Sequence, residues 1–461
     1  MSQSAAPSSA PSDTPKKPKR GVVLKTPIPG PKAKDVIERD RRVLMTTTKS
    51  SPIVAESGDG IWITDVDGNR LLDFASGVSV NNVGYAHPDV VRAVRDQVGR
   101  LSHFAGTDFY YDAQVRLAER LVRIVPGEFE KKVFFTNSGA ESTEAALKIV
   151  RWHRQRPIVL GLLGAFHGRT MGALTLTASK PVQRARYSAF VEGGHHIPAP
   201  TCYRCPYQLE YPSCDLYCAR ILKELYFQTS IPPDDVAAMI VEPVLGEGGY
   251  VVPPKGWFPT MKSILDEHGI LLIDDEVQAG MGRTGRWFGI EHHGVVPDLV
   301  TMAKALGGGL PMGAVAFRSD LDFPVSGSHS NTFGGNLLAS AAALATLDVI
   351  EKERLLDNAR VQGAYLLDRL RELQTRHDEI GDVRGLGLMT ATEFVRDRRT
   401  KEPAVRLRDR VIEESYRRGL ILLPCGRSTI RYIPPFIVRR EEIDEAMEIL
   451  DAAIGAARAR E

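Results

Sequence analysis

A lysine in an apolar, glycine-rich stretch is the strongest chemical signal in this chain. Lys304 lies in the segment Ala-Lys-Ala-Leu-Gly-Gly-Gly-Leu-Pro, residues 303–311. Removing an ammonium group from water disfavours its charged form and lowers its pKa, which makes a neutral amine available. A neutral amine condenses with an aldehyde. The sequence therefore predicts that Lys304 is a Schiff-base lysine.

A second segment supplies an acid. Residues 269–278 read Gly-Ile-Leu-Leu-Ile-Asp-Asp-Glu-Val-Gln, which predicts a buried strand that ends in carboxylates. In an open parallel sheet, ligands bind where the strands end. A lysine that holds an aldehyde and an acid that keeps a ring nitrogen protonated are the groups that pyridoxal 5'-phosphate requires. We therefore expect this cofactor.

A turn rich in small residues predicts an anion site. Residues 136–142, Thr-Asn-Ser-Gly-Ala-Glu-Ser, follow one predicted strand and begin a helix. The free N–H groups and the positive dipole end of a helix favour a phosphate, and small residues let it approach. The alternative is an ordinary helix start that Ser or Asn caps.

Two more segments follow predicted strands. Phe166, in Ala-Phe-His-Gly-Arg-Thr (165–170), offers an aromatic ring that would stack on a pyridine or pack against a helix. Residues 241–249 place Glu242 and Glu247 near the same edge of the sheet. Carboxylates there need cations or ligand groups to balance them.

Six motifs, in this order, resemble those of the class III aminotransferases. They are residues 137–141, 166–169, 242–249, 275–285, 304–309 and 331–336. These pyridoxal-phosphate enzymes of fold type I include the ornithine, acetylornithine and 4-aminobutyrate aminotransferases. The resemblance covers roughly residues 40–458.

The resemblance implies roles for the cofactor site. Lys304 would hold the cofactor aldehyde and later move the proton, and Asp275 would pair with the ring nitrogen. Gln278 would approach the ring hydroxyl, and Phe166 or His167 would cover the ring face. Gly139 and Ala140 would bind phosphate through their backbone, and Thr332 would reach the phosphate of a neighbouring subunit. The expected cofactor-binding residues are Ser138, Gly139, Ala140, Phe166, His167, Glu242, Asp275, Gln278, Lys304 and Thr332.

The resemblance also implies a substrate site. Arg431 would grip the substrate α-carboxylate, which suits a two-pronged donor. Glu247 would cover this arginine when an ω-amine occupies the site. Val80 lies in residues 75–88, which we expect to line the substrate entrance.

The expected function is transfer of an amino group from an ω-amino acid, of the 4-aminobutyrate, ornithine or acetylornithine type, to a 2-oxo acid such as 2-oxoglutarate. A pyridoxal-phosphate-dependent amino-acid racemase or epimerase is the first alternative, and it needs a second acid or base on the opposite face of the reacting carbon. A catalytically silent regulatory or scaffold homologue is the second alternative.

The pattern along the chain predicts a large α/β domain with a mostly parallel sheet and a small α+β lobe built from both chain ends. The resemblance implies that this is fold type I, with a sheet of the seven-stranded type. Candidate strands are 132–136, 158–163, 237–242, 270–274 and 314–318, and residues 385–389 and 430–433 are expected as strands of the small lobe. The expected organisation is a disordered arm (1–30), the N-terminal part of the small lobe (31–80), the large cofactor domain (81–335) and the C-terminal small domain (336–461).

Composition points to small-molecule chemistry. The net charge of +2 gives no reason to expect nucleic acid or a membrane surface as a partner, and no apolar run is long enough to span a bilayer. We expect a cytoplasmic enzyme that binds an amino donor and a 2-oxo acid. The role of Thr332 implies a homodimer with shared active sites, or a dimer of dimers.

An insertion at 200–220 carries clustered cysteines. Cys202, Cys205, Cys214 and Cys218 have the spacing C-x2-C-x8-C-x3-C. Such thiols suit a structural zinc or iron-sulfur centre, while disulfides and free thiols remain open.

Overall fold

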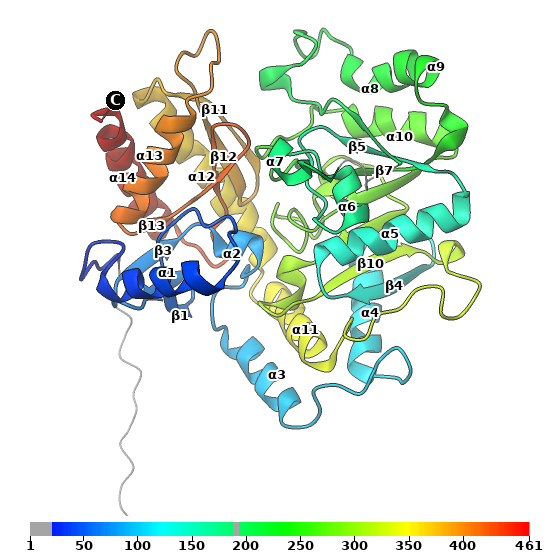
Figure 1. Ribbon diagram of the computed structural model, residues 1–461, viewed down its shortest axis with the longest axis horizontal. Coiled ribbons are helices and arrows are strands. Elements are labelled where there is room, and N and C mark those ends of the chain that lie inside the picture. Colours follow the sequence, from blue (N-terminus) through cyan, green and yellow to red (C-terminus); the bar gives the residue numbers. More distant parts are fainter. Residues whose placement is uncertain (1–20, 188–192, 461) are drawn as a thin grey trace, which may run out of the picture.

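A seven-stranded sheet forms the centre of the large domain (Figure 1). The computed structural model describes residues 21–187 and 193–460. Strand β10 is antiparallel to its neighbours β4 and β9, and the other neighbouring strands are parallel. In sheet order the strands are β4 (Lys131–Thr136), β10 (Gly313–Arg318), β9 (Leu299–Met302), β8 (Leu271–Asp275), β7 (Val236–Val241), β5 (Ile158–Leu162) and β6 (Gly194–Ile197). The predicted mostly parallel α/β fold is confirmed.

Helices cover both faces of this sheet because its strands alternate two sets of apolar side chains. Leu272 joins the cluster that contains Trp257 of α10 (Trp257–Glu267). Leu271 and Ile273 point the other way and join the cluster that α5 (Gly139–Arg154) fills. Period-two alternation places successive residues on opposite faces, so each strand contributes to two cores. Further helices complete the two layers: α4 (Asp112–Ile124), α6 (Met171–Leu176), α7 (Pro181–Arg184), α8 (Tyr217–Ile221) and α9 (Phe227–Thr229).

The five candidate strands of the large domain coincide with β4, β5, β7, β8 and β10 to within one residue at each end. The sequence did not predict β6 and β9, which have only four residues each. A run that short shows no clear apolar pattern.

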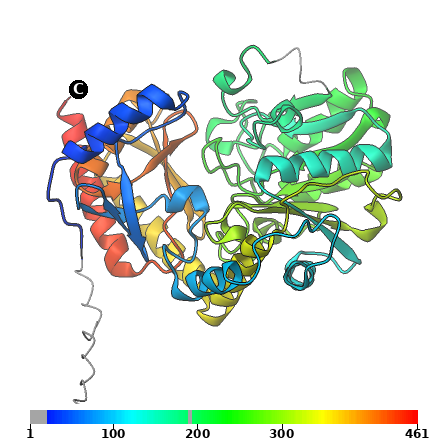
Figure 2. The ribbon, with the colours of Figure 1, turned by 60° about the horizontal axis from the view of Figure 1, so that its bottom comes forward.

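The small lobe joins the two ends of the chain. Leu72 of β3 (Arg70–Asp73) pairs in parallel with Leu420 of β13 (Leu420–Ile421), in a sheet that β1 (Ala55–Asp59) and β2 (Trp62–Asp65) complete. The second sheet has the order β11 (Ile380–Leu386), β12 (Met389–Phe394), β15 (Thr429–Tyr432) and β14 (Leu423–Cys425). The helices of the small lobe are α1 (Pro31–Val43), α12 (Leu355–Arg376), α13 (Val405–Arg417) and α14 (Arg440–Arg458). Figure 2 shows that the early (blue) and late (red) segments of the chain lie together in this lobe.

One helix, α11 (Leu337–Lys352), contributes side chains to the cores of both the large domain and the small lobe. α11 packs against α3 (Pro88–Val98), and its residues divide between the two cores. Ala343 and Leu347 join the large-domain cluster, whereas Val349 and Ile350 join that of the small lobe. The expected boundary at 336 therefore falls at the start of a helix that bridges the two parts.

Two expectations need correction. Residues 21–30 were expected in a disordered arm, yet the N–H of Val22 donates to Glu445 (2.7 Å) and Ile28 is buried. The rest of the arm, with Lys16, Lys17, Lys19 and Arg20, lies outside the described residues. Residues 385–389 are not one strand; they contain the tight turn between β11 and β12, where Gly387 has a φ of +54°.

Candidate active site

Most of the predicted site residues lie at one edge of the large sheet. Strands β4, β5, β7, β8 and β9 run in the same direction, so their carboxyl ends meet there. The fold brings the following loops into contact. A Cβ on Gly139 would lie 2.8 Å from Val277, and one on Gly246 would lie 2.2 Å from Gln278.

Lys304 follows β9 and begins the short helix Lys304–Gly307. Its side chain is half-buried, and its φ of +47° is unusual for a residue other than glycine. Burial and, next, the positive charge of Arg431 lower the pKa of Lys304 to about 8, although nearby carboxylates, Asp275 foremost, oppose the shift. About a tenth of the amine is therefore neutral near pH 7, far more than for a lysine with the ordinary pKa of 10.5.

His167 and Asp275 form a buried pair. Nδ1 of His167 lies 2.6 Å from Oδ2 of Asp275, and the other carboxylate oxygen accepts the N–H of Val277 (3.0 Å). Burial alone lowers the pKa of His167, but the hydrogen bond and charge of Asp275, together with Glu242, raise it above its ordinary value. His167 therefore holds the Asp275 carboxylate in place. Of the two residues expected to cover the ring, Phe166 is the one whose ring is half-exposed.

The turn before α5 is built to receive an anion. Ser138 caps the helix by accepting the N–H of Glu141 (3.2 Å). The first-turn N–H groups of Gly139 and Ala140 have no acceptor among the described residues. Ser142 Oγ donates to the carbonyl of Met302 (3.1 Å), which ties this turn to the strand before Lys304. The geometry agrees with a phosphate site within reach of the lysine.

Glu242 connects two loops of the site. Its carboxylate oxygens accept the N–H of Phe166 (3.2 Å) and the N–H of Gly246 (3.1 Å). Burial raises the pKa of Glu242, with the nearby His167 acting against this shift. Gln278 lies close by, because both side chains border Gly246. Since both oxygens of Glu242 bind backbone, the structure gives it a positioning role.

An ion-paired cluster lies where the small lobe faces this site. Nη1 of Arg431, on β15, donates to Oε2 of Glu247 (3.2 Å), and Nζ of Lys180 donates to Oε1 of the same carboxylate (2.6 Å). Burial by itself lowers the pKa of Arg431, but the neighbouring Tyr250, Cys425 and Glu247 raise it. The structure thus brings Arg431 and Glu247 together as expected from the sequence and adds Lys180, for which no role was expected.

The loop that carries Val80 follows α2 (Ser76–Ser79), which packs on the Lys304–Gly307 helix. Val80 is half-buried. Arg283, which is fully buried, fastens this loop: its guanidinium binds Ser79 (2.9 Å) and the carbonyl of Pro434 (2.6 Å). Burial lowers the pKa of Arg283 to about 9. Arg283 lies in one of the six motifs, at residues 275–285, but its fastening role was not predicted from the sequence.

Thr332 is exposed, outside this cluster. Its loop is held by Asn331, whose amide donates to the carbonyl of Phe135 (2.8 Å), and by the contact between Phe333 and His103, whose ring centroids are 4.8 Å apart. Thr332 therefore lies apart from the residues that surround Lys304 in its own chain.

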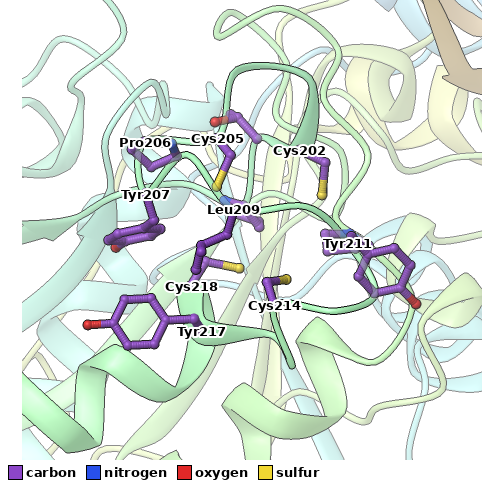
Figure 3. A pocket seen from close by; sticks show the side chains of 12 residues that line it. Cys202, Cys205, Pro206, Tyr207, Leu209, Tyr211, Cys214, Tyr217 and Cys218 are labelled. Carbon is purple, nitrogen blue, oxygen red and sulfur yellow. The ribbon is translucent and has the colours of Figure 1, made fainter.

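The cysteine insertion forms a separate, small pocket (Figure 3). Cys202, Cys205, Cys214 and Cys218 line it as free thiols. Burial, and then the neighbouring thiols, raise the pKa of Cys218 to about 12, so this side chain is protonated. In residues 21–187 and 193–460, no group of three or more His, Cys, Asp or Glu side chains is arranged to hold a metal ion. The structure therefore brings the four cysteines to one pocket, and the metal site stays a prediction.

The residues at the sheet edge fit pyridoxal 5'-phosphate. Lys304 supplies a partly neutral amine, and Asp275 supplies a fixed carboxylate for the ring nitrogen. The N–H groups of Gly139 and Ala140, which have no acceptor within the described part of the chain, suit the phosphate. The buried Nε2 of His167, which has no partner among the described side chains, also agrees with a polar group nearby.

Among the described helices, none combines the length and the apolar composition that a membrane span requires.

Known proteins agree with this site. The sequence model of the class-III aminotransferases matches residues 45–454. Leucine/methionine racemase from Thermococcus litoralis is 40% identical over 91% of this chain and 95% of its own, and 5-aminovalerate aminotransferase from Pseudomonas aeruginosa is 40% identical over 87% and 92%. The structure of an (S)-enantioselective omega-transaminase from Thermomicrobium roseum superimposes with a TM-score of 0.85 at 34% identity, covering 92% of this chain and 99% of that one. The chain belongs to the class III aminotransferase family, and it is a pyridoxal-phosphate-dependent aminotransferase.

Proposed function

We propose that this enzyme moves the amino group of an ω-amino acid, of the 4-aminobutyrate or ornithine type, to a 2-oxo acid such as 2-oxoglutarate. The observation that carries this proposal is the contact between Arg431 and Glu247. An ω-amino acid bears no carboxylate next to its reacting carbon, so Glu247 balances the arginine while such a substrate is bound. A 2-oxo acid bears one, which then replaces Glu247 on the guanidinium.

The chain's own groups then have distinct tasks. Bound pyridoxal phosphate supplies an aldehyde that accepts the amino group and a ring that withdraws electrons from the substrate carbon. Lys304, as a neutral amine, would take the proton from that substrate carbon and return it to the cofactor carbon that bears the transferred nitrogen. Asp275 keeps the ring nitrogen protonated, and Arg431 orients the acceptor carboxylate.

The relatives support two substrate classes. A 5-aminovalerate aminotransferase acts on an ω-amino acid, which favours the proposal. A leucine/methionine racemase of equal identity makes racemisation the second candidate. Racemisation returns the proton to the same carbon from the opposite face, so it needs a second acid or base there.

A donor panel tests the proposal. The holoenzyme is incubated with 2-oxoglutarate and each of several amines, and the glutamate formed is measured. We expect 4-aminobutyrate or ornithine to be among the best donors, well above α-amino acids such as leucine. In parallel, single L-amino acids without any oxo acid are followed by chiral chromatography. Accumulation of the D-enantiomer, without glutamate formation from the ω-amines, would contradict the proposal and support the racemase.

We also infer a homodimer whose active sites are shared. Exposed apolar side chains lie on residues 101–115, a segment that contacts the Thr332 loop through His103 and Gln114, and on that loop itself. They are Leu101, Phe104, Phe109, Tyr110, Val115 and Phe333, of which Tyr110 is 97% exposed. An apolar surface of this kind is typical of an interface. A second copy of the chain would cover it and bring its phosphate turn to the otherwise unused Thr332.

A further inference from the structure

We propose that Lys180 is a positioning residue that holds the Glu247 carboxylate when a substrate carboxylate displaces it from Arg431. This inference rests on the proposed function, because it concerns how the pair between Glu247 and Arg431 opens. Lys180 precedes α7 in the large domain, whereas Arg431 lies in the small lobe. Glu247 is therefore shared by two cations from different parts of the fold.

The two oxygens of Glu247 are divided between these cations. Oε1 lies 2.6 Å from Nζ of Lys180, and Oε2 lies 3.2 Å from Nη1 of Arg431. The contact with Lys180 is the shorter of the two. It is also the more exposed, since the Lys180 side chain is 38% exposed and that of Arg431 only 9%. A substrate carboxylate that approaches Arg431 thus competes for one oxygen and leaves the other bound.

Only the side chain of Glu247 is free to move. Its carbonyl accepts the N–H of Gly426 (2.8 Å), and two residues later the carbonyl of Gly249 accepts Arg384 Nη2 (2.7 Å). A Cβ on Gly248 would lie 2.5 Å from Leu245, so this loop is tightly packed. Opening therefore amounts to a rotation of the Glu247 side chain about an anchored backbone.

Lys180 is itself held in position. Gln183 Oε1 accepts the backbone N–H of Lys180 (3.2 Å) and the hydroxyl of Ser179 (2.6 Å), and Gln183 is buried. This capping arrangement fixes the turn from which the lysine extends. The backbone from which the ammonium reaches Glu247 is therefore fixed, and only the lysine side chain has to be ordered by the ion pair.

Without Lys180, a displaced Glu247 would lose both of its cations in a partly buried place, which is costly. Glu247 would then bind Arg431 more persistently and compete better against the substrate. Binding of 2-oxo acids would weaken. Binding of ω-amines, which leave the pair closed, would change little.

The test uses holoenzyme with Lys180→Met, Lys180→Arg and Glu247→Gln, and Lys223→Met as the matched control. Lys223 forms a comparable ion pair with Glu267 (2.7 Å), away from the site. Isothermal titration calorimetry gives the Kd of glutarate, a dicarboxylate that cannot react, and steady-state kinetics give kcat and KM for 2-oxoglutarate and 4-aminobutyrate.

For Lys180→Met we expect the glutarate Kd and the 2-oxoglutarate KM to rise about two- to fivefold, the range of a solvent-accessible ion pair. The 4-aminobutyrate KM and kcat should change by less than this, Lys180→Arg should restore binding, and Lys223→Met should behave as the wild type. In the Glu247→Gln background, Lys180→Met should have no effect, because Lys180 acts through the carboxylate.

The outcomes separate the two proposals. Glu247→Gln alone should tighten glutarate binding and raise the 4-aminobutyrate KM; if it does neither, the switch itself fails and the role of Lys180 fails with it. If Glu247→Gln acts as expected but Lys180→Met matches Lys223→Met, only the role of Lys180 is overturned. A weakening that persists in the Glu247→Gln background also overturns it, since Lys180 would then attract the ligand directly.

Discussion

His167 and Asp275 face each other inside the large domain, with Nδ1 and Oδ2 separated by 2.6 Å and both side chains shielded from water. One hydrogen bond therefore fixes the carboxylate that the cofactor ring nitrogen requires. His167 follows β5 and Asp275 ends β8, so the bond also ties these two strands together. Loss of either partner leaves the other buried and unpaired.

We expect His167→Leu to lower the stability of the apo-protein by about 3–5 kcal/mol, the usual cost of breaking a buried charged pair. Cofactor affinity should fall as well, because Asp275 is no longer oriented. Thermal unfolding monitored by circular dichroism measures the first effect. His195→Leu, at an exposed histidine, is the control. An unchanged unfolding midpoint for His167→Leu would show that the pair contributes nothing.

Lys304→Ala should abolish covalent attachment of the cofactor and lower the rate of amino transfer by at least about 100-fold, the scale of general acid–base catalysis. Borohydride reduction of the wild-type holoenzyme followed by peptide mapping should place the label on Lys304. Circular dichroism checks that the variant is folded. A label on any other lysine would remove the basis of the site.

Capture of the cofactor aldehyde by the apo-enzyme should accelerate with rising pH and level off above about 8, because only the neutral amine of Lys304 reacts and its pKa is about 8. Stopped-flow absorbance measures the rate. Since the charge of Arg431 helps to lower this pKa, Arg431→Met should move the midpoint upward, toward the ordinary lysine value of 10.5. A wild-type midpoint near 10.5 would contradict the lowered pKa.

Gly139→Ala should weaken cofactor binding about tenfold or more, since the added Cβ would lie 2.8 Å from Val277 and disturb the phosphate turn. Fluorescence titration of the apo-enzyme measures the Kd. Gly455→Ala is a matched control in α14, where a Cβ meets nothing within 4 Å. There the better helix propensity of alanine should raise stability by about 1 kcal/mol without any effect on the cofactor.

Tyr110→Glu should shift the enzyme from dimer to monomer, because it places a charge in the apolar surface that we assign to the subunit interface. Sedimentation velocity measures the assembly state. Val405→Glu introduces the same charge at an exposed apolar position on α13 and should leave assembly unchanged. A wild-type protein that sediments as a monomer would refute the shared active site.

The positions of most strands of the large sheet and the chemistry expected of the site followed from the sequence. Continuous apolar runs such as 270–273 indicate buried strands, because both faces of a parallel sheet are covered. Lys304 and the residues of the phosphate turn were recognisable because each is unusual among its own neighbours: a cation among apolar residues, and small residues at a helix start. Such signals are local, so they can be recognised in the sequence without knowledge of the fold.

Tertiary structure alone decided which distant side chains share a contact. Nothing near Lys180 in the sequence distinguishes it from a surface lysine, yet the fold places its ammonium on Glu247, 67 positions away. In the same way His167 turned out to hold Asp275, and the cysteine spacing that suits a metal did not produce a metal-binding arrangement among the described residues. Periodicity and residue type are properties of a short segment, whereas the meeting of two side chains depends on how every intervening strand, helix and loop closes.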